Sequence, residues 1–262
     1  MTARVLPALV VLALLCLAAP VRASERYAIV ITGATGGSEH AERFDQWRDT
    51  FVTLLLEQYG YSRDHVVALG ETPRPGVQPA TREHVRAAID QVARQATEQD
   101  VVIVLLMGHG SIFEGDDAKF NLVGPDLSVD EWAVLIKPIP GRLVFVNTTA
   151  GSSSFLRKLA ARNRVVVTAT SATAQRYTTV FPEFFIEAFE DSGADADRDG
   201  RVSIWEAFEY ASAGVKTWFR DQGQPATERA LIDDTGVGAG REASDPGADD
   251  GLARRTYLGP DS

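Results

Sequence analysis

Five short apolar runs recur along the chain, and they constrain its fold more than any other feature. Each run is rich in branched aliphatic residues, and turn-forming residues and a polar, helix-like segment separate it from the next. The runs are residues 27–32, 65–69, 101–107, 143–146 and 165–169. Apolar runs without polar alternation are typical of parallel strands buried on both faces. The sequence therefore predicts an α/β fold with a doubly wound, mainly parallel sheet flanked by helices.

The segments between the runs carry helix signals. Residues 44–55 place aromatic and aliphatic side chains at helical spacing, and Thr81 can cap a second helix. Ser128 and Glu131 form the S-x-x-E pattern of a capping box, which predicts a short helix after them. The run at 101–107 (VVIVLLM) is the most hydrophobic outside the N-terminal segment, so we expect it to be the central strand.

The first 23 residues have the pattern of a secretory signal peptide. Arg4 supplies a positive start, residues 5–19 are apolar, and residues 21–23 (VRA) resemble a cleavage site. The apolar stretch is shorter than the ~20 residues that a membrane span needs. We therefore expect a secreted or periplasmic protein with no membrane span after signal removal. Cys16, the only cysteine, lies in this segment, so the mature chain would have no thiol.

The formal net charge of −10 belongs to the last third of the chain. Residues 181–262 hold 18 acidic and 8 basic residues, whereas the preceding residues hold 18 of each. This distribution argues against nucleic-acid binding and favours cations or basic partners. We expect one α/β domain over residues 24–219, followed by an acidic C-terminal tail over residues 220–262.

Residues 195–206 (DADRDGRVSIWE) have the ligand pattern of an EF-hand calcium loop. Carboxylates occupy positions 1, 3, 5 and 12, and a glycine at position 6 permits the sharp turn. The expected ligands are Asp195, Asp197, Asp199, the backbone carbonyl of Arg201, Ser203 and Glu206. Helix-like segments at 181–190 and 207–219 flank the loop, which predicts a helix–calcium loop–helix near the C-terminus with Ca²⁺ as cofactor. A solvated acidic turn is the alternative interpretation.

A glycine-rich turn at residues 32–37 (TGATGG) suggests a minor alternative, a nucleotide-binding Rossmann-like protein. The pattern lacks its third glycine, because Glu39 stands there, and Glu42 adds a second negative charge. The apolar helical stripe begins only at Phe44, so we expect the helix to begin too late to hold a pyrophosphate.

His109 lies between two glycines directly after the run at 101–107. Its ring could act as a base, and the N–H of Gly110 could donate to an oxyanion. The alternative is a histidine that is simply hydrogen-bonded within its loop.

Residues 108–111 (GHGS) and 147–151 (NTTAG), each at the end of an apolar strand, together resemble the caspase and legumain type of cysteine peptidase. In that family, a histidine follows one strand and the nucleophilic cysteine ends the next. The resemblance covers about residues 27–179. It implies a caspase-like fold with His109 as the base and Thr149 at the position of the cysteine.

Thr149 departs from the family pattern, because an alcohol is a much weaker nucleophile than a thiolate unless a base is positioned beside it. We therefore predict a protein without peptidase activity that binds or scaffolds a peptide or protein partner. The alternative is an active hydrolase that uses His109 with Thr149 or a nearby serine. The candidate serines are Ser152, Ser153 and Ser154.

Overall fold

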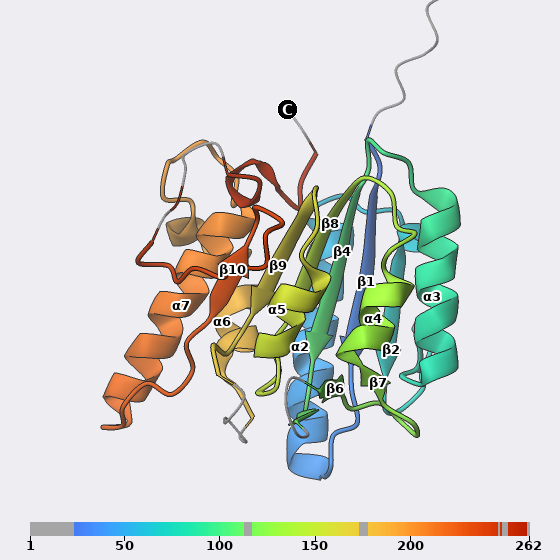
Figure 1. Ribbon diagram of the computed structural model, residues 1–262, viewed down its shortest axis with the longest axis horizontal. Helices are drawn as coiled ribbons and strands as arrows, with labels where there is room; N and C mark the ends of the chain where they lie inside the picture. Colours follow the sequence, from blue (N-terminus) through green and yellow to red (C-terminus); the bar gives the residue numbers. More distant parts are fainter. Residues whose placement is uncertain (1–23, 113–116, 173–177, 246, 248–250, 261–262) are drawn as a thin grey trace, which may run out of the picture.

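A computed structural model describes most of the chain after the proposed signal peptide, which lies outside the described residues. The described residues are 24–112, 117–172, 178–245, 247 and 251–260. A seven-stranded sheet in the order β10-β9-β8-β4-β1-β2-β3 forms the centre of the molecule (Figure 1). Its neighbouring strands are parallel, except that β10 runs antiparallel to β9. The predicted α/β fold with a mainly parallel sheet is therefore confirmed.

The five apolar runs form five strands of this sheet, each within one residue of the predicted bounds. They are β1 (Arg26–Thr32), β2 (Val66–Gly70), β4 (Val101–Met107), β8 (Arg142–Asn147) and β9 (Arg164–Thr168). Strand β4 lies at the centre, as expected, between β1 and β8. The edge strands β3 (Val77–Pro79) and β10 (Leu231–Asp233) were not predicted, because three residues are too few to show a pattern.

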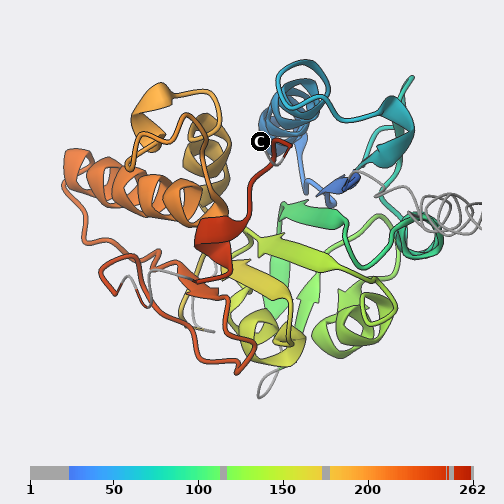
Figure 2. The same ribbon diagram turned by 90° about the horizontal axis from the view of Figure 1, so that it is seen from above.

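Helices cover both faces of the sheet and form three layers (Figure 2). One face carries α2 (Ser38–Glu57), α6 (Phe181–Glu187) and α7 (Ile204–Asp221). The other carries α3 (Arg82–Gln95), α4 (Val129–Leu135) and α5 (Ser153–Leu159). Three short 3₁₀ turns complete the set: η1 (Arg63–His65), η2 (Ser192–Ala194) and η3 (Ala253–Arg255). Within the described ranges, no helix combines the length and apolarity needed to cross a bilayer.

The predicted helix caps are present. The Thr81 side chain accepts from the N–H of His84, and Ser128 and Glu131 form a complete capping box. The expected late start of the helix after the glycine-rich turn was wrong, because α2 begins at Ser38. The first residues of α2 are mostly polar and are exposed or half-buried. The apolar stripe of the helix therefore begins only at Phe44, although the helix itself begins earlier.

A small antiparallel sheet lies beside the carboxyl ends of the main strands (Figure 1). It consists of β5 (Gly110–Ile112), β6 (Ala118–Phe120) and β7 (Leu127–Ser128). The carbonyl of Asn121 accepts from the N–H of Ala34, and a Cβ at Gly33 would lie 2.2 Å from the same oxygen. The first glycine of the turn is therefore required by this close packing, and no bound nucleotide is needed to explain it.

The acidic C-terminal segment is built into the domain over its described parts. Strand β10 extends the sheet, and Ile232, Ala253 and Leu258 are buried in the same core as α7. These apolar residues lie in runs of three residues or fewer between polar, glycine-rich stretches, so the sequence of the segment resembles a tail even though it packs.

Ile232→Ala should therefore lower the free energy of unfolding by about 2–5 kcal/mol, the usual cost of such a cavity in a core. Val237→Ala is the control, because Val237 belongs to the same segment but is 75% exposed. Chemical denaturation checks both variants. An effect of Ile232→Ala no larger than that of Val237→Ala would show that the segment contributes little to the folded core.

Candidate functional site

The direction of chain winding reverses between β1 and β4. Several loops lie together at this position, at the carboxyl ends of the strands. The chain passes from β1 to β2 on one side and later from β4 to β8 on the other. In open α/β sheets, ligands bind at the carboxyl ends of the strands where the winding reverses. The loops after β1, β4 and β8 meet there and contain the glycine-rich turn, His109 and Thr149.

His109 is half-buried and hydrogen-bonded to the first of these loops. Its Nε2 lies 3.0 Å from the carbonyl oxygen of Thr35, and its ring contacts those of His40 and Phe44. A carbonyl only accepts, so Nε2 carries the proton and Nδ1 holds the lone pair of the neutral ring. Burial lowers the pKa of His109. The bond to Thr35 opposes this shift, and the positive charges of His40 and Arg43 add to it.

Glu71 supports the loop that holds His109. Its Oε2 accepts from both the backbone N–H and the hydroxyl of Thr35, which orients the Thr35 carbonyl. The glutamate follows β2 directly, so it reaches the loop from the neighbouring strand. The sequence analysis did not single out Glu71 or Thr35. Glu71 could have been proposed from the sequence, because it is an acidic residue at the carboxyl end of a predicted parallel strand.

Thr149 is completely buried, and its hydroxyl makes no hydrogen bond to any residue in the described ranges. Its backbone N–H donates to Asn147 Oδ1 at 3.0 Å. A Cβ at Gly110 would lie 2.6 Å from Thr149 Oγ1, so the two loops are in direct contact and only glycine fits at position 110. The structure thus brings the His109 and Thr149 loops together. It does not join the two side chains by a hydrogen bond, since the threonine hydroxyl has no partner.

The three nearby serines are also enclosed. Ser152 is fully buried, and its Oγ lies 3.2 Å from Thr170 Oγ1 and accepts from the Thr170 N–H. The hydroxyl oxygens of Ser153 and Ser154 are buried, and neither has a hydrogen-bond partner in the part of the chain that the structure describes. Within the part of the chain that the structure describes, none of these hydroxyls is hydrogen-bonded to His109.

Glu228 is a buried carboxylate near this end of the sheet that the sequence analysis also missed. It accepts from the backbone N–H groups of Val180 and Phe181, which start α6. Burial raises the pKa of Glu228 to about 7, although these N–H groups act in the opposite direction. The adjacent Thr179 hydroxyl donates to the Thr148 carbonyl, so Glu228 helps to hold the segment that covers the Thr149 loop.

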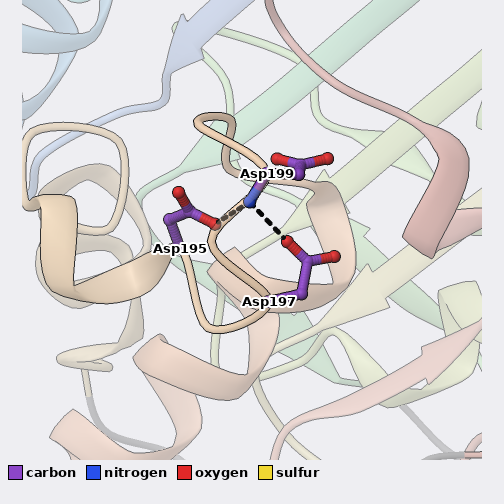
Figure 3. Close-up of side chains that lie close together, drawn as sticks. All are labelled: Asp195, Asp197 and Asp199. Carbon is purple, nitrogen blue, oxygen red and sulfur yellow. Dashed lines mark hydrogen bonds between the residues drawn. The ribbon is translucent and has the colours of Figure 1, made fainter.

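At the opposite end of the sheet, the loop before α7 gathers three carboxylates (Figure 3). One oxygen from each of Asp195, Asp197 and Asp199 lies within 4.8 Å of the others. The amide of Asp199 donates to both of the other aspartates, and Gly200, with φ of 86°, makes the turn. Opposed calcium ligands lie about 5 Å apart, since each Ca–O distance is 2.3–2.6 Å. The three aspartates therefore fit a calcium ion.

Glu206 and Ser203 connect this loop to α7. The Ser203 hydroxyl accepts from the Glu206 N–H, and the Glu206 carboxylate accepts from the Ser203 N–H, which forms a capping box. The other Glu206 oxygen accepts from the N–H groups of Ala196 and Asp197. The buried carboxylate thus lies across the start of the loop, but it does not belong to the group of three aspartates whose oxygens lie within 4.8 Å of one another.

The surroundings of Asp197 raise the pKa of its carboxyl overall. The N–H of Asp199 lowers this pKa, but desolvation and the negative charges of Glu206, Asp199 and Asp195 outweigh that effect. A cation would relieve the repulsion between these carboxylates.

Comparison with known proteins gives limited but consistent matches. No model of a known protein family matches the chain. Over 96 residues, the chain is 29% identical to Metacaspase-4 of Arabidopsis thaliana, a match that covers 33% of this chain and 23% of that protein. The chain therefore matches less than a quarter of that relative's length. This similarity supports a caspase-like domain.

The fold also has a match among solved structures. The crystal structure of protein GSU0716 from Geobacter sulfurreducens superposes with a TM-score of 0.52 at 12% sequence identity. The match covers 80% of this chain and 92% of that one. At this identity, the likeness concerns the fold alone.

Because burial is the main influence on His109, its pKa should lie below the usual value of about 6.5. A titration of its ring signals by NMR checks this, and a midpoint at or above 6.5 would contradict it. The folded state then binds this proton less tightly than the unfolded chain, so stability should rise as pH increases through the window just below 6.5. His109→Gln should lose that part of the pH dependence.

Proposed function

We propose that the protein is an exported, calcium-binding, caspase-like domain that lacks peptidase activity and acts by binding a peptide or protein partner. The similarity to a metacaspase supports the caspase-like part. The signal-like residues 1–23 and the acidic pattern of residues 195–206 support export and calcium binding.

The burial and hydrogen bonding of the Thr149 hydroxyl are the main support for the proposal that the protein lacks peptidase activity. A nucleophilic alcohol needs a base within hydrogen-bond reach and must be open to substrate. Among the described residues, Thr149 Oγ1 is buried without a hydrogen-bond partner, and it packs close to the backbone of Gly110. His109 directs its Nε2 to the Thr35 carbonyl. The two loops therefore meet through packing at Gly110. A binding role does not require the two side chains to be hydrogen-bonded to each other, whereas catalysis does.

Calcium would act structurally in this proposal. The loop joins the η2 turn to α7 and lies at the opposite end of the sheet from His109, so the ion is remote from the Thr149 loop (Figure 1). Asp195, Asp197, Asp199 and Glu206 would hold it, with Ser203 and the Arg201 carbonyl completing the shell. Extracellular modules bind calcium with dissociation constants of about 10⁻⁴–10⁻³ M, which suffices outside the cell.

Calcium at 10 mM should then stabilise the protein by about 1.4–2.7 kcal/mol, because the folded state binds the ion and the unfolded chain does not. Thermal unfolding with calcium and with a chelator measures this gain. Asp197→Asn and Glu206→Gln should abolish it, whereas Asp221→Asn, on the exposed end of α7, should keep it. An equal gain in Asp197→Asn and wild type would rule out the loop as the site.

Peptide hydrolysis tests the other half of the proposal. Wild type should not cleave a mixed peptide library, because Thr149 has no base beside it. Thr149→Cys supplies a thiol of similar size, and any activity that it gains should disappear when His109→Ala is added. Cleavage by wild type that His109→Ala abolishes would overturn the proposal in favour of an active hydrolase.

A further inference from the structure

The C-terminal segment lies directly against the acidic loop. The N–H of Ile204 donates to the carbonyl of Thr256 at 2.8 Å, and Ser203 and Tyr257 form an antiparallel bridge. Thr256 and Leu258, on either side of Tyr257, are buried. Tyr257 is therefore held in place by its neighbours, independently of its own side chain.

The Tyr257 side chain touches two of the residues expected to bind calcium. Its hydroxyl donates to Asp199 Oδ2 at 3.1 Å. The guanidinium of Arg201, whose backbone carbonyl is an expected ligand, lies 3.6 Å from the centre of the Tyr257 ring. One aromatic residue thus supports two adjacent ligand positions from outside the loop.

The bonds to Asp199 leave room for a cation. Asp199 Oδ1 accepts from the N–H of Arg201 at 2.8 Å, and Oδ2 accepts from Tyr257. A carboxylate has about four lone-pair positions, so each oxygen can still face an ion. Without the tyrosine, the exposed Asp199 side chain would keep only the bond from the Arg201 N–H, so it would be less restrained and would lose more entropy on binding.

We infer that Tyr257 is a positioning residue that orients the Asp199 carboxylate for calcium, so that the C-terminal segment sets the affinity of the loop. The inference rests on the calcium site proposed above. Calcium loops of this kind often occur in pairs, and this chain has no second loop with the same carboxylate spacing. The C-terminal segment supplies the support from outside that the single loop otherwise lacks.

Tyr257→Phe tests the inference, because it removes only the hydroxyl and keeps the ring beneath Arg201. Tyr210→Phe is the matched control: its hydroxyl donates to Asp191 Oδ2 at 2.9 Å, a carboxylate outside the loop. Calorimetric titration with calcium chloride should show affinity about tenfold weaker for Tyr257→Phe, the size of effect expected for a residue behind a metal ligand. Tyr210→Phe should bind as wild type does.

A second pair of variants separates positioning from general stabilisation. In an Asp199→Asn background, Tyr257→Phe should cause no further loss of affinity, since its effect acts through that carboxylate. The melting temperature of Tyr257→Phe in chelator should match that of Tyr210→Phe.

The outcomes distinguish the two proposals. If wild type binds no calcium, the calcium site itself is wrong and the inference fails with it. If wild type binds but Tyr257→Phe binds equally well, or the losses from Asp199→Asn and Tyr257→Phe simply add, the calcium site stands and the positioning role is overturned.

Discussion

Strand β4 is paired along both edges and buried on both faces, and the placement of the candidate site depends on that pairing. Its register aligns Met107 with Thr32 of β1 and Leu106 with Asn147 of β8. The residues that follow these three strands therefore leave the sheet side by side. A shift of one residue would exchange the two buried faces of β4. Both faces are apolar, so the packing of individual side chains against the helices on each face opposes the shift, rather than the hydrophobic pattern alone. The proximity of the His109 and Thr149 loops follows from this register without any bond between their side chains.

The sequence predicted the central strands because burial on two faces requires uninterrupted apolar runs. The same reasoning could not find β3 or β10, which have three residues each. It also missed the small sheet over the carboxyl ends, whose strands are no longer than three residues. Signals that depend on few residues were reliable only where they were chemically specific, as in the capping box of Ser128 and Glu131.

The candidate site shows a similar division. The two sequence motifs predicted that His109 and Thr149 lie in neighbouring loops. They did not predict two contacts that determine the chemistry of these side chains, because one comes from a distant residue and the other from the backbone. The Thr35 carbonyl sets which nitrogen of His109 carries the proton, and Gly110 presses against the Thr149 hydroxyl. A buried hydroxyl without a partner costs about 1–3 kcal/mol. That cost is incurred in the loop whose sequence resembles the nucleophile motif of the caspase type, and the fold tolerates it there.

The two candidate sites lie at opposite ends of α7, which limits how they can influence one another. The helix has 18 residues and spans about 27 Å, from the acidic loop to Trp218 and Phe219. Those two aromatic side chains and Glu228 line a cavity beside Thr179, whose hydroxyl bonds to the Thr149 loop. Calcium bound at the start of α7 would affect the C-terminal end of the helix only by fixing the helix itself. The positions of Trp218 and Phe219 would then be fixed with it. In the function proposed above, a permanently bound ion would hold one arrangement of these residues, whereas a sensor would switch between two.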